Sequence, residues 1–221
     1  MKSLTRTALL LAPLLLVACG KKEAETAAPA VPAPAPVSAP AAPANPAELS
    51  DEQRAQQEKQ KALEYATLED KYINDPRAQW ASTASASSTF GDPEPAESNM
   101  AKNTTGKVDG SDWNNNNQTI GFDTLELGYE KPVAATEVRL VVPEGEGVDT
   151  ISKIELQDTD GKWNVIWSGV PDGKRDERGP RTWYVRSFDK TLYKVKAVRY
   201  TIANNLHHGY KRVDAAQLVG D

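Results

Sequence analysis

Two adjacent histidines, His207 and His208, are the side chains best suited to acid-base or metal chemistry. A catalytic triad would need a nucleophile beside one of them, and no G-x-S-x-G elbow marks a serine for that role. A zinc site would use both rings on one metal, whereas neighbouring side chains of an extended segment point to opposite sides. We therefore expect no enzyme, but a loop that presents His208 and Tyr210 to solvent or to a ligand.

The segment "DTDG", Asp158 to Gly161, has the spacing that opens a calcium-binding loop. The later ligands of such a loop are missing from the following "KWNVIWSG". A hairpin turn also favours Asp-Gly, because the turn requires positive φ angles. The pattern therefore predicts a hairpin turn here.

Four consecutive asparagines follow Trp113 in "DWNNNNQT". Side-chain amides both donate and accept hydrogen bonds, and sugar hydroxyls need both. A second polar loop would form the opposite wall if the fold brings the two together, and an arginine of the loop 173–183 could stack on a sugar. The alternative is a set of solvated polar loops without a ligand. The candidate ligand-binding residues are Asn114, Asn115, Asn116, Asn117, Asn205, His207, His208, Tyr210 and Arg178.

The only cysteine, Cys19, ends an apolar run from Ala8 to Val17 that follows Lys2 and Arg6. This run is too short for a permanent membrane-spanning helix. A basic start, an apolar stretch and small residues before the cleavage point are typical of a secretory signal peptide. We predict a signal peptide over residues 1–18.

The residues "LVAC", Leu16 to Cys19, resemble the lipobox of bacterial lipoproteins. The resemblance implies acylation of Cys19 by diacylglycerol and palmitate-like chains, which would anchor the protein in a membrane of the cell envelope. Gly20 stands where an aspartate would retain such a protein in the inner membrane, so the Gram-negative outer membrane is the expected location. The alternative is an ordinary signal peptide with a chance cysteine.

The composition excludes some partners. The formal net charge is -5 and the sequence has no face rich in Lys and Arg, so nothing favours nucleic acid, whose binding depends on neutralising phosphates. With Cys19 acylated no disulfide is available, and the fold must rest on its core.

Residues 19–49 repeat Ala-Pro and predict a disordered linker. A charged helix over 50–74 follows, with Ser50 as N-cap and Gln53 as its capping-box partner, and it ends before Pro76. Its apolar stripe is thin, which favours a solvated spacer; docking on the next domain and weak self-association are the alternatives.

Residues 78–221 consist of short β-branched and aromatic runs separated by Gly, Asn, Asp and Pro. Such runs are typical of an all-β domain. We expect Trp113 in the core and inward-facing positions at Phe122, Leu125 and Leu127. Shared faces are predicted for Val138, Leu140 and Val142, for Ile154 and Leu156, and for Trp163, Val165 and Trp167.

Six segments in order resemble the discoidin or coagulation-factor 5/8 type C group of galactose-binding-like domains: "QWASTASASSTFG", "VDGSDWNN", "TLELGYEKPVAATEVRLVVP", "ISKIELQDTDGKWNVIWSG", "VKAVRYTIAN" and "GYKRVDAAQLVG". The resemblance covers Trp80 to Gly220 and implies a jelly-roll β-sandwich with function on the loops at its ends. Many relatives hold a structural calcium with a glutamate of the last strand. Here that strand offers Ala215 and Gln217, which leaves Asp109, Asp112 and Asp214 as calcium candidates and no expected cofactor.

Together these features predict a non-catalytic envelope lipoprotein whose sandwich binds carbohydrate or another envelope ligand. The alternative is a scaffold lipoprotein that holds a protein partner, with the helix as part of the interface.

Overall fold

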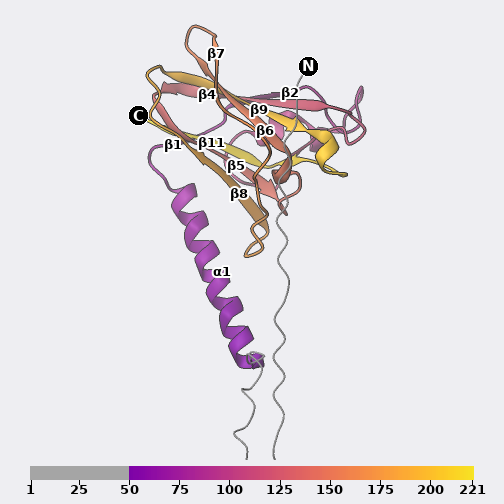
Figure 1. Ribbon diagram of the computed structural model, residues 1–221, viewed down its shortest axis with the longest axis vertical. Coiled ribbons are helices and arrows are strands. Elements are labelled where there is room, and N and C mark those ends of the chain that lie inside the picture. The colour runs from indigo at the N-terminus through magenta and orange to yellow at the C-terminus, as the bar shows by residue number, and fades with distance from the viewer. Residues whose placement is uncertain (1–49) are drawn as a thin grey trace, which may run out of the picture. The chain divides into compact units, whose positions relative to one another are not determined.

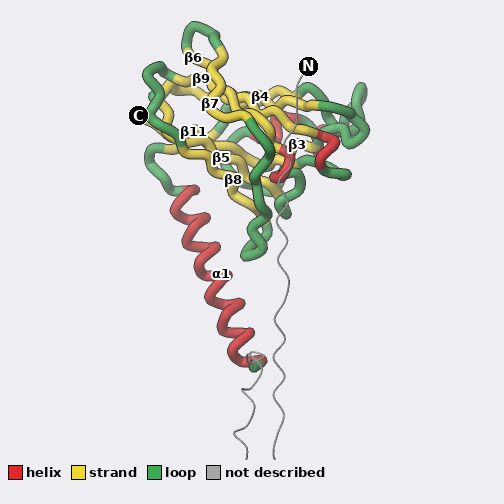
Figure 2. The backbone as a smooth tube through the Cα atoms, in the orientation of Figure 1, coloured by secondary structure: helices red, strands yellow, loops and turns green. Residues whose placement is uncertain are grey.

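The computed structural model describes residues 50–221 (Figure 1), so the predicted signal peptide, Cys19 and the Ala/Pro linker lie outside the described residues. The described part contains one α-helix, α1 (Asp51–Ile73), the long red helix of Figure 2. No helix of this part is long and apolar enough to cross a membrane. The strands are β1 (Ala78–Trp80), β2 (Thr83–Ala86), β3 (Trp113–Asn114), β4 (Phe122–Val133), β5 (Ala135–Pro143), β6 (Ile151–Asp158), β7 (Trp163–Ser168), β8 (Arg181–Ser187), β9 (Val195–Ala203), β10 (Arg212–Val213) and β11 (Ala215–Gly220).

These strands form a β-sandwich, which confirms the predicted fold class. One sheet has the order β1-β11-β5-β8, the other has the order β2-β4-β9-β6-β7, and β3 pairs with β10 in a short third sheet. All pairs are antiparallel. Four short 3-10 helices lie in the connections: Glu97–Asn99, Ala101–Thr104, Val148–Thr150 and Asn204–Leu206.

The core lies between the two large sheets and follows the predicted alternation. Leu125 and Leu127 of β4 and Ile154 and Leu156 of β6 are fully buried. Burying each such side chain contributes about 1.5–3 kcal/mol to folding. Trp113 is also fully buried, and its Nε1 donates to the carbonyl oxygen of Ser88 at 3.0 Å. Its predicted place in the core is therefore confirmed.

Two predicted faces are wrong. Phe122 is 65% exposed. It lies an odd number of residues from Leu125 and Leu127, so its side chain points to the opposite, outer face of the sheet. In β7 the pairing with β6 shifts between Ile154 and Glu155, and such a bulge ends the alternation. As a result Trp167 packs against the core while Val165 remains 57% exposed.

Helix α1 begins with the predicted capping box. The amide of Gln53 donates to Ser50 Oγ at 3.2 Å, and the amide of Ser50 donates to Gln53 Oε1 at 3.0 Å. Asn74 is the C-cap and Pro76 follows two residues later. Residues 51–64 are exposed, so the expected solvated helix holds for this half.

The second half of α1 docks on the outer face of the four-stranded sheet, which corrects the expectation of a spacer along its whole length. Tyr65 is 5% exposed, and its hydroxyl donates to Glu69 Oε1 and to the carbonyl oxygen of Arg181. Glu69 also accepts hydrogen bonds from Arg181 Nη1 at 3.2 Å and Trp183 Nε1 at 3.3 Å. Further along, the ring of Tyr72 lies 5.1 Å from that of Trp183.

The register places four connections at one end of the sandwich: residues 87–121, 144–150, 169–180 and 204–214. We call this the loop end. The hairpin at Asp158–Lys162, the β4–β5 turn and the C-terminus lie at the opposite end. Gly161 has a φ of 91°, as the predicted hairpin turn requires.

Candidate functional site

A cleft of about 550 Å³ opens at the loop end between three connections. Such a volume lies within the range of small-molecule sites, about 300–1,000 Å³. We call it the loop-end cleft. It is lined by Glu144, Gly145, Glu146, Val148, Asp149, Gly173, Lys174, Arg175, Glu177 and His207.

The polar groups of this cleft are mostly unused within the described chain. Glu144, Glu177, Lys174 and Arg175 are exposed, and no hydrogen bond or ion pair of residues 50–221 involves their charged groups. The ring of His207 is near one charged group, with Nδ1 at 3.7 Å from Asp149 Oδ2. The cleft thus offers both donors and acceptors to a ligand.

The side chain of Lys211 fixes the conformation of the loop that carries His207. It is 3% exposed, and its ammonium donates to the carbonyl oxygens of Asn204, His207 and Gly209 at 3.3, 2.8 and 2.9 Å. Burial lowers the pKa of Lys211, although the negative charges of Asp123 and Asp149 oppose this shift. The sequence carried no signal for this role, because the three carbonyls come together only in the folded loop.

Asn115 connects the two loops that were predicted to face each other across a binding site, but its own side chain is fully buried. Its Nδ2 donates to Asp123 Oδ2 and Asn204 Oδ1, both at 3.2 Å, and its Oδ1 accepts from the amide of Lys211 at 2.9 Å. The loops 114–117 and 204–211 therefore lie side by side, as the ligand hypothesis required. Asn115 serves the fold in place of the expected ligand contact.

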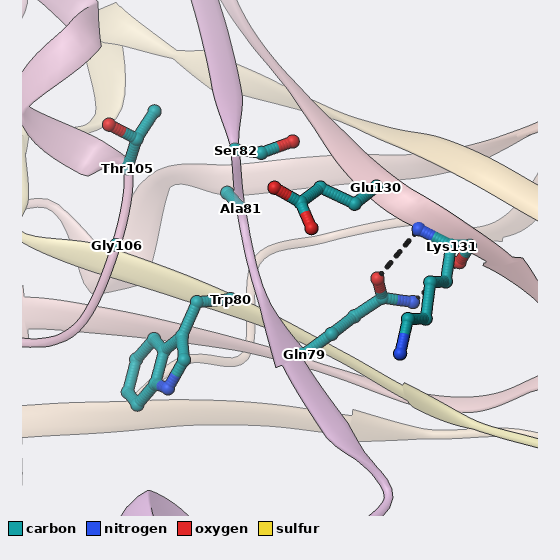
Figure 3. Close-up of a pocket in the computed structure, with 8 residues that line it drawn as sticks. All are labelled: Gln79, Trp80, Ala81, Ser82, Thr105, Gly106, Glu130 and Lys131. Atoms are coloured by element: carbon teal, nitrogen blue, oxygen red, sulfur yellow. Dashed lines mark hydrogen bonds between the residues drawn. The ribbon is translucent and has the colours of Figure 1, made fainter.

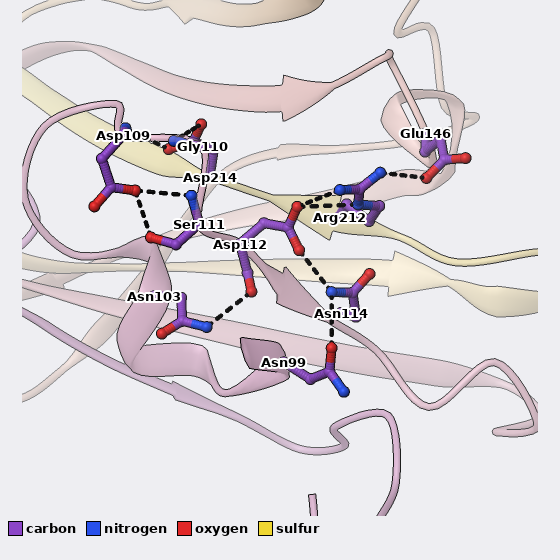
Figure 4. A network of polar contacts seen from close by, with 10 residues as sticks. All are labelled: Asn99, Asn103, Asp109, Gly110, Ser111, Asp112, Asn114, Glu146, Arg212 and Asp214. Atoms are coloured by element: carbon purple, nitrogen blue, oxygen red, sulfur yellow. Dashed lines mark hydrogen bonds and ion pairs between the residues drawn. The ribbon is translucent and has the colours of Figure 1, made fainter. Parts of the chain in front are cut away.

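Asn114 belongs to a polar network shown in Figure 4. Its Nδ2 donates to Asp112 Oδ1 at 2.6 Å and to Asn99 Oδ1 at 3.3 Å. The other oxygen of Asp112 accepts two hydrogen bonds from Arg212, at 3.0 and 2.6 Å. Arg212 also lies 3.4 Å from Glu146 of the loop-end cleft. The network thus fixes one edge of the cleft.

The calcium candidates do not fit a metal site. Asp112 is 5% exposed and its carboxylate is engaged by the Arg212 guanidinium, whose positive charge stands where a cation would have to bind. Asp214 instead accepts from the amides of Asp109 and Gly110, at 3.3 and 3.2 Å. Residues 50–221 contain no group of three or more His, Cys, Asp or Glu side chains arranged for a metal ion.

An aromatic pair lies on the neighbouring surface of the loop end. The rings of Phe90 and Tyr210 meet edge to face with centroids 5.0 Å apart, and both are partly exposed. Asn117, Asn205 and His208 are exposed. Half-buried Asn116 accepts from the amide of Gln118 and donates its own amide to Ser88 Oγ.

Arg178 lies apart from these residues. Its guanidinium forms two hydrogen bonds with Asp176, at 2.9 and 2.8 Å, and lies 3.8 Å from Glu64 of α1. The hydrogen bonds that Arg178 donates to Asp176 raise the pKa of Arg178. Arg178 therefore interacts with its own loop and with α1.

A second cleft, of about 540 Å³, is shown in Figure 3 beside β1 and the end of β4. Its polar groups are largely used by the fold: Gln79 Nε2 donates to the carbonyl oxygen of Lys131 at 2.6 Å, and Gln79 Oε1 accepts from the amide of Lys131 at 3.1 Å. Trp80 packs toward Trp183 under the helix, with centroids 6.3 Å apart. The loop-end cleft is the better candidate, because most of its charged groups remain free.

No protein-family model matches the chain. No curated protein matches it either. Among solved structures it is similar to CpGH89CBM32-5 from Clostridium perfringens, solved with GalNAc-β-1,3-galactose, at 13% identity and a TM-score of 0.48, over 67% of this chain and 99% of that one.

Two further similar structures are of the same kind. The family 32 CBM of C. perfringens NanJ, solved with galactose, matches at 16% identity and a TM-score of 0.44, over 66% of this chain and 96% of that one. Chitosan-binding module 1 of a chitosanase/glucanase from Paenibacillus sp. IK-5 matches at 12% identity and a TM-score of 0.47, over 62% of this chain and 94% of that one.

Proposed function

We propose that the sandwich is a non-catalytic carbohydrate-binding domain and that the loop-end cleft is its site. One observation carries the proposal: carboxylates, cations and His207 gather there with most of their polar groups free, and the partly exposed Phe90 and Tyr210 rings lie at the same end of the sandwich. Sugars are bound by hydrogen bonds to both donors and acceptors together with packing on aromatic rings.

Support for a non-catalytic role comes from the lining of the cleft. It contains no serine, threonine or cysteine for nucleophilic attack. Glycoside hydrolysis would need one carboxylic acid in an apolar, dry setting, whereas the side chains of Asp149 and Glu146 are 53% and 39% exposed. The cleft is therefore suited to holding a ligand.

We further propose that the chain is a lipoprotein of the bacterial envelope, anchored through acylated Cys19 in the Gram-negative outer membrane. The support is the apolar run, the "LVAC" motif and Gly20. An anchored binding domain would hold envelope glycans close to the membrane.

A glycan array probed with the full chain tests the binding proposal. We expect signal on a defined subset of glycans, with loss of that signal in His207→Ala and Arg175→Ala. Leu192→Ala, at a fully exposed position of the opposite end, is the matched control and should bind as the parent does. An array without specific signal would contradict the proposal.

One observation supports the scaffold alternative: the first half of α1 is exposed and presents an apolar side chain, Leu63, which is 62% exposed. Crosslinking in cells separates the two functions. Recovery of one stoichiometric envelope protein, lost on substitution of Leu63 and not of His207, would favour the scaffold.

A further inference from the structure

The outer face of the five-stranded sheet carries a groove of about 550 Å³ that shares no residue with the loop-end cleft. Helix α1 packs on the other sheet, through Tyr65 and Tyr72. We call this hollow the sheet-face groove. It is lined by Phe122, Thr124, Ser152, Lys153, Glu155, Ser168, Gly169, Arg199 and Thr201.

The strand register brings hydroxyl groups together in this groove. Thr124 of β4 is paired with Thr201 of β9, and Thr201 is paired with Lys153 of β6. Lys153 in turn is paired with Ser168 of β7. Directly paired residues point to the same face of a sheet. Three hydroxyl-bearing residues and one lysine therefore form a row across four neighbouring strands.

The charges of the groove neutralise one another. Arg199 Nε donates to Glu126 Oε1 at 2.8 Å, and its Nη1 lies 3.7 Å from Glu155 Oε2. Lys153 Nζ lies 3.1 Å from the same oxygen. Two cations thus face two carboxylates, and the surface has no excess of either sign to attract a phosphate, a nucleic acid or a charged peptide.

The groove also has an apolar platform. Phe122 is 65% exposed at one end, and no other aromatic ring of residues 50–221 packs on it. Glu155 is 8% exposed, and the charge of its Oε2 is balanced within the groove by Lys153 and Arg199.

We propose that the sheet-face groove is a second binding site, for a neutral carbohydrate. The ring of one sugar packs on Phe122, and its hydroxyls meet Thr124, Thr201 and Ser168. Balanced charge, aligned hydroxyls and an exposed ring together suit an uncharged polyhydroxylated ligand and no charged one. This site goes beyond the loop-end cleft and does not depend on it.

Amide chemical shifts of the full chain during titration with lactose, cellobiose and chitobiose test this site, with inorganic phosphate as the charged probe. We expect at least one neutral disaccharide to cause saturable shifts at Phe122, Thr124, Thr201 and Ser168, with none from phosphate. Phe122→Ala should weaken that binding about tenfold through loss of ring packing. Ser168→Trp, which fills the groove from its edge strand, should abolish it.

Leu192→Ala removes a fully exposed apolar side chain outside the groove and should leave the titration unchanged. Shifts confined to the loop-end cleft would support the proposed function and overturn the second site. Absence of groove shifts with all three sugars, or shifts there with phosphate, would also overturn it.

Discussion

The guanidinium of Arg139, in the middle of β5, donates to the carboxylate of Asp75 at 2.8 Å and so ties the end of the helix to the centre of a sheet. The Arg139 side chain is 4% exposed and also bonds Glu137 and, at 3.0 Å, Gln217 Oε1. The ring of Tyr72 covers it, with the guanidinium carbon 4.4 Å from the centroid. The docked half of α1 is thus held by a buried charge as well as by aromatic packing.

Removing that charge should destabilise the domain strongly. Arg139→Met leaves Asp75 and Glu137 without their buried partner, and breaking such a pair costs about 3–5 kcal/mol. Urea unfolding measures the change in the free energy of unfolding. Arg77→Met at the same carboxylate is the control, because Arg77 is 57% exposed and 3.8 Å away, and it should cost less than about 1 kcal/mol. Equal losses of unfolding free energy in Arg139→Met and Arg77→Met would contradict the prediction that the buried pair contributes more than the exposed one.

The same pair predicts a pH dependence. Desolvation opposes ionisation of Asp75, but hydrogen bonds from Arg139 and from the amide of Arg77 outweigh it and lower its pKa. A carboxyl with a lowered folded-state pKa stabilises the protein above its unfolded pKa, about 3.9, and this stability is lost as the pH falls through the folded value.

We therefore expect the stability gap between the parent chain and Asp75→Asn to be full at pH 6 and to close as the pH falls below about 3.9. Thermal unfolding across that range measures it. If the difference in stability between the parent chain and Asp75→Asn stayed constant to the lowest pH measured, the contribution of Asp75 would not depend on its charge.

Tyr210 should contribute to stability as well as to ligand contact. Its edge-to-face contact with Phe90 belongs to a class worth about 0.5–1.5 kcal/mol. Tyr210→Ala and Phe90→Ala should each lower the free energy of unfolding by about 1 kcal/mol, and the double variant by less than the sum. Additive losses would mean that the rings act independently.

Calcium should not stabilise the domain. Because Arg212 holds both the Asp112 carboxylate and the edge near Glu146, the melting midpoint should be the same with calcium and with EDTA. Arg212→Met should lower the midpoint in both conditions. A midpoint that rises with calcium in the parent chain would overturn this assignment of the network.

Acylation of Cys19 has a direct test in cells. Cys19→Ser should abolish metabolic labelling with palmitate and leave an unprocessed or released protein, because the sequence has no other cysteine. Labelling that persists in this variant would refute the anchor.

Sequence alternation predicted the inner faces of the sheets apart from Phe122 and β7, but it did not predict the burial of an outer face. Leu125, Leu127 and Trp113 lie where the pattern and the turn signals put them. In β5, however, Arg139 and Val141 are as buried as their inward-facing neighbours, because α1 and its following loop cover that sheet from outside. The thin apolar stripe of the helix did not predict this, since two tyrosines, Glu69 and a buried ion pair provide the contact.

The site was predictable only in outline. Amides, imidazoles and Tyr210 marked loops that the fold brings side by side, but the burial of Asn115 depends on Asn204 and Asp123, which are adjacent to it only in the folded chain. Glu144, Asp149 and Arg175 carry no local motif, and the fold alone brings them to His207.

The direction of α1 has a consequence for orientation. Tyr65 meets Arg181 at the start of β8, and Tyr72 meets Trp183 further along it, so the helix follows β8 away from the loop end. Its exposed residues 51–64 extend past that end for about 20 Å, at 1.5 Å per residue. Ser50 is thus the far end of a stiff helix that leaves the domain at the loop end, the end that also carries the loop-end cleft.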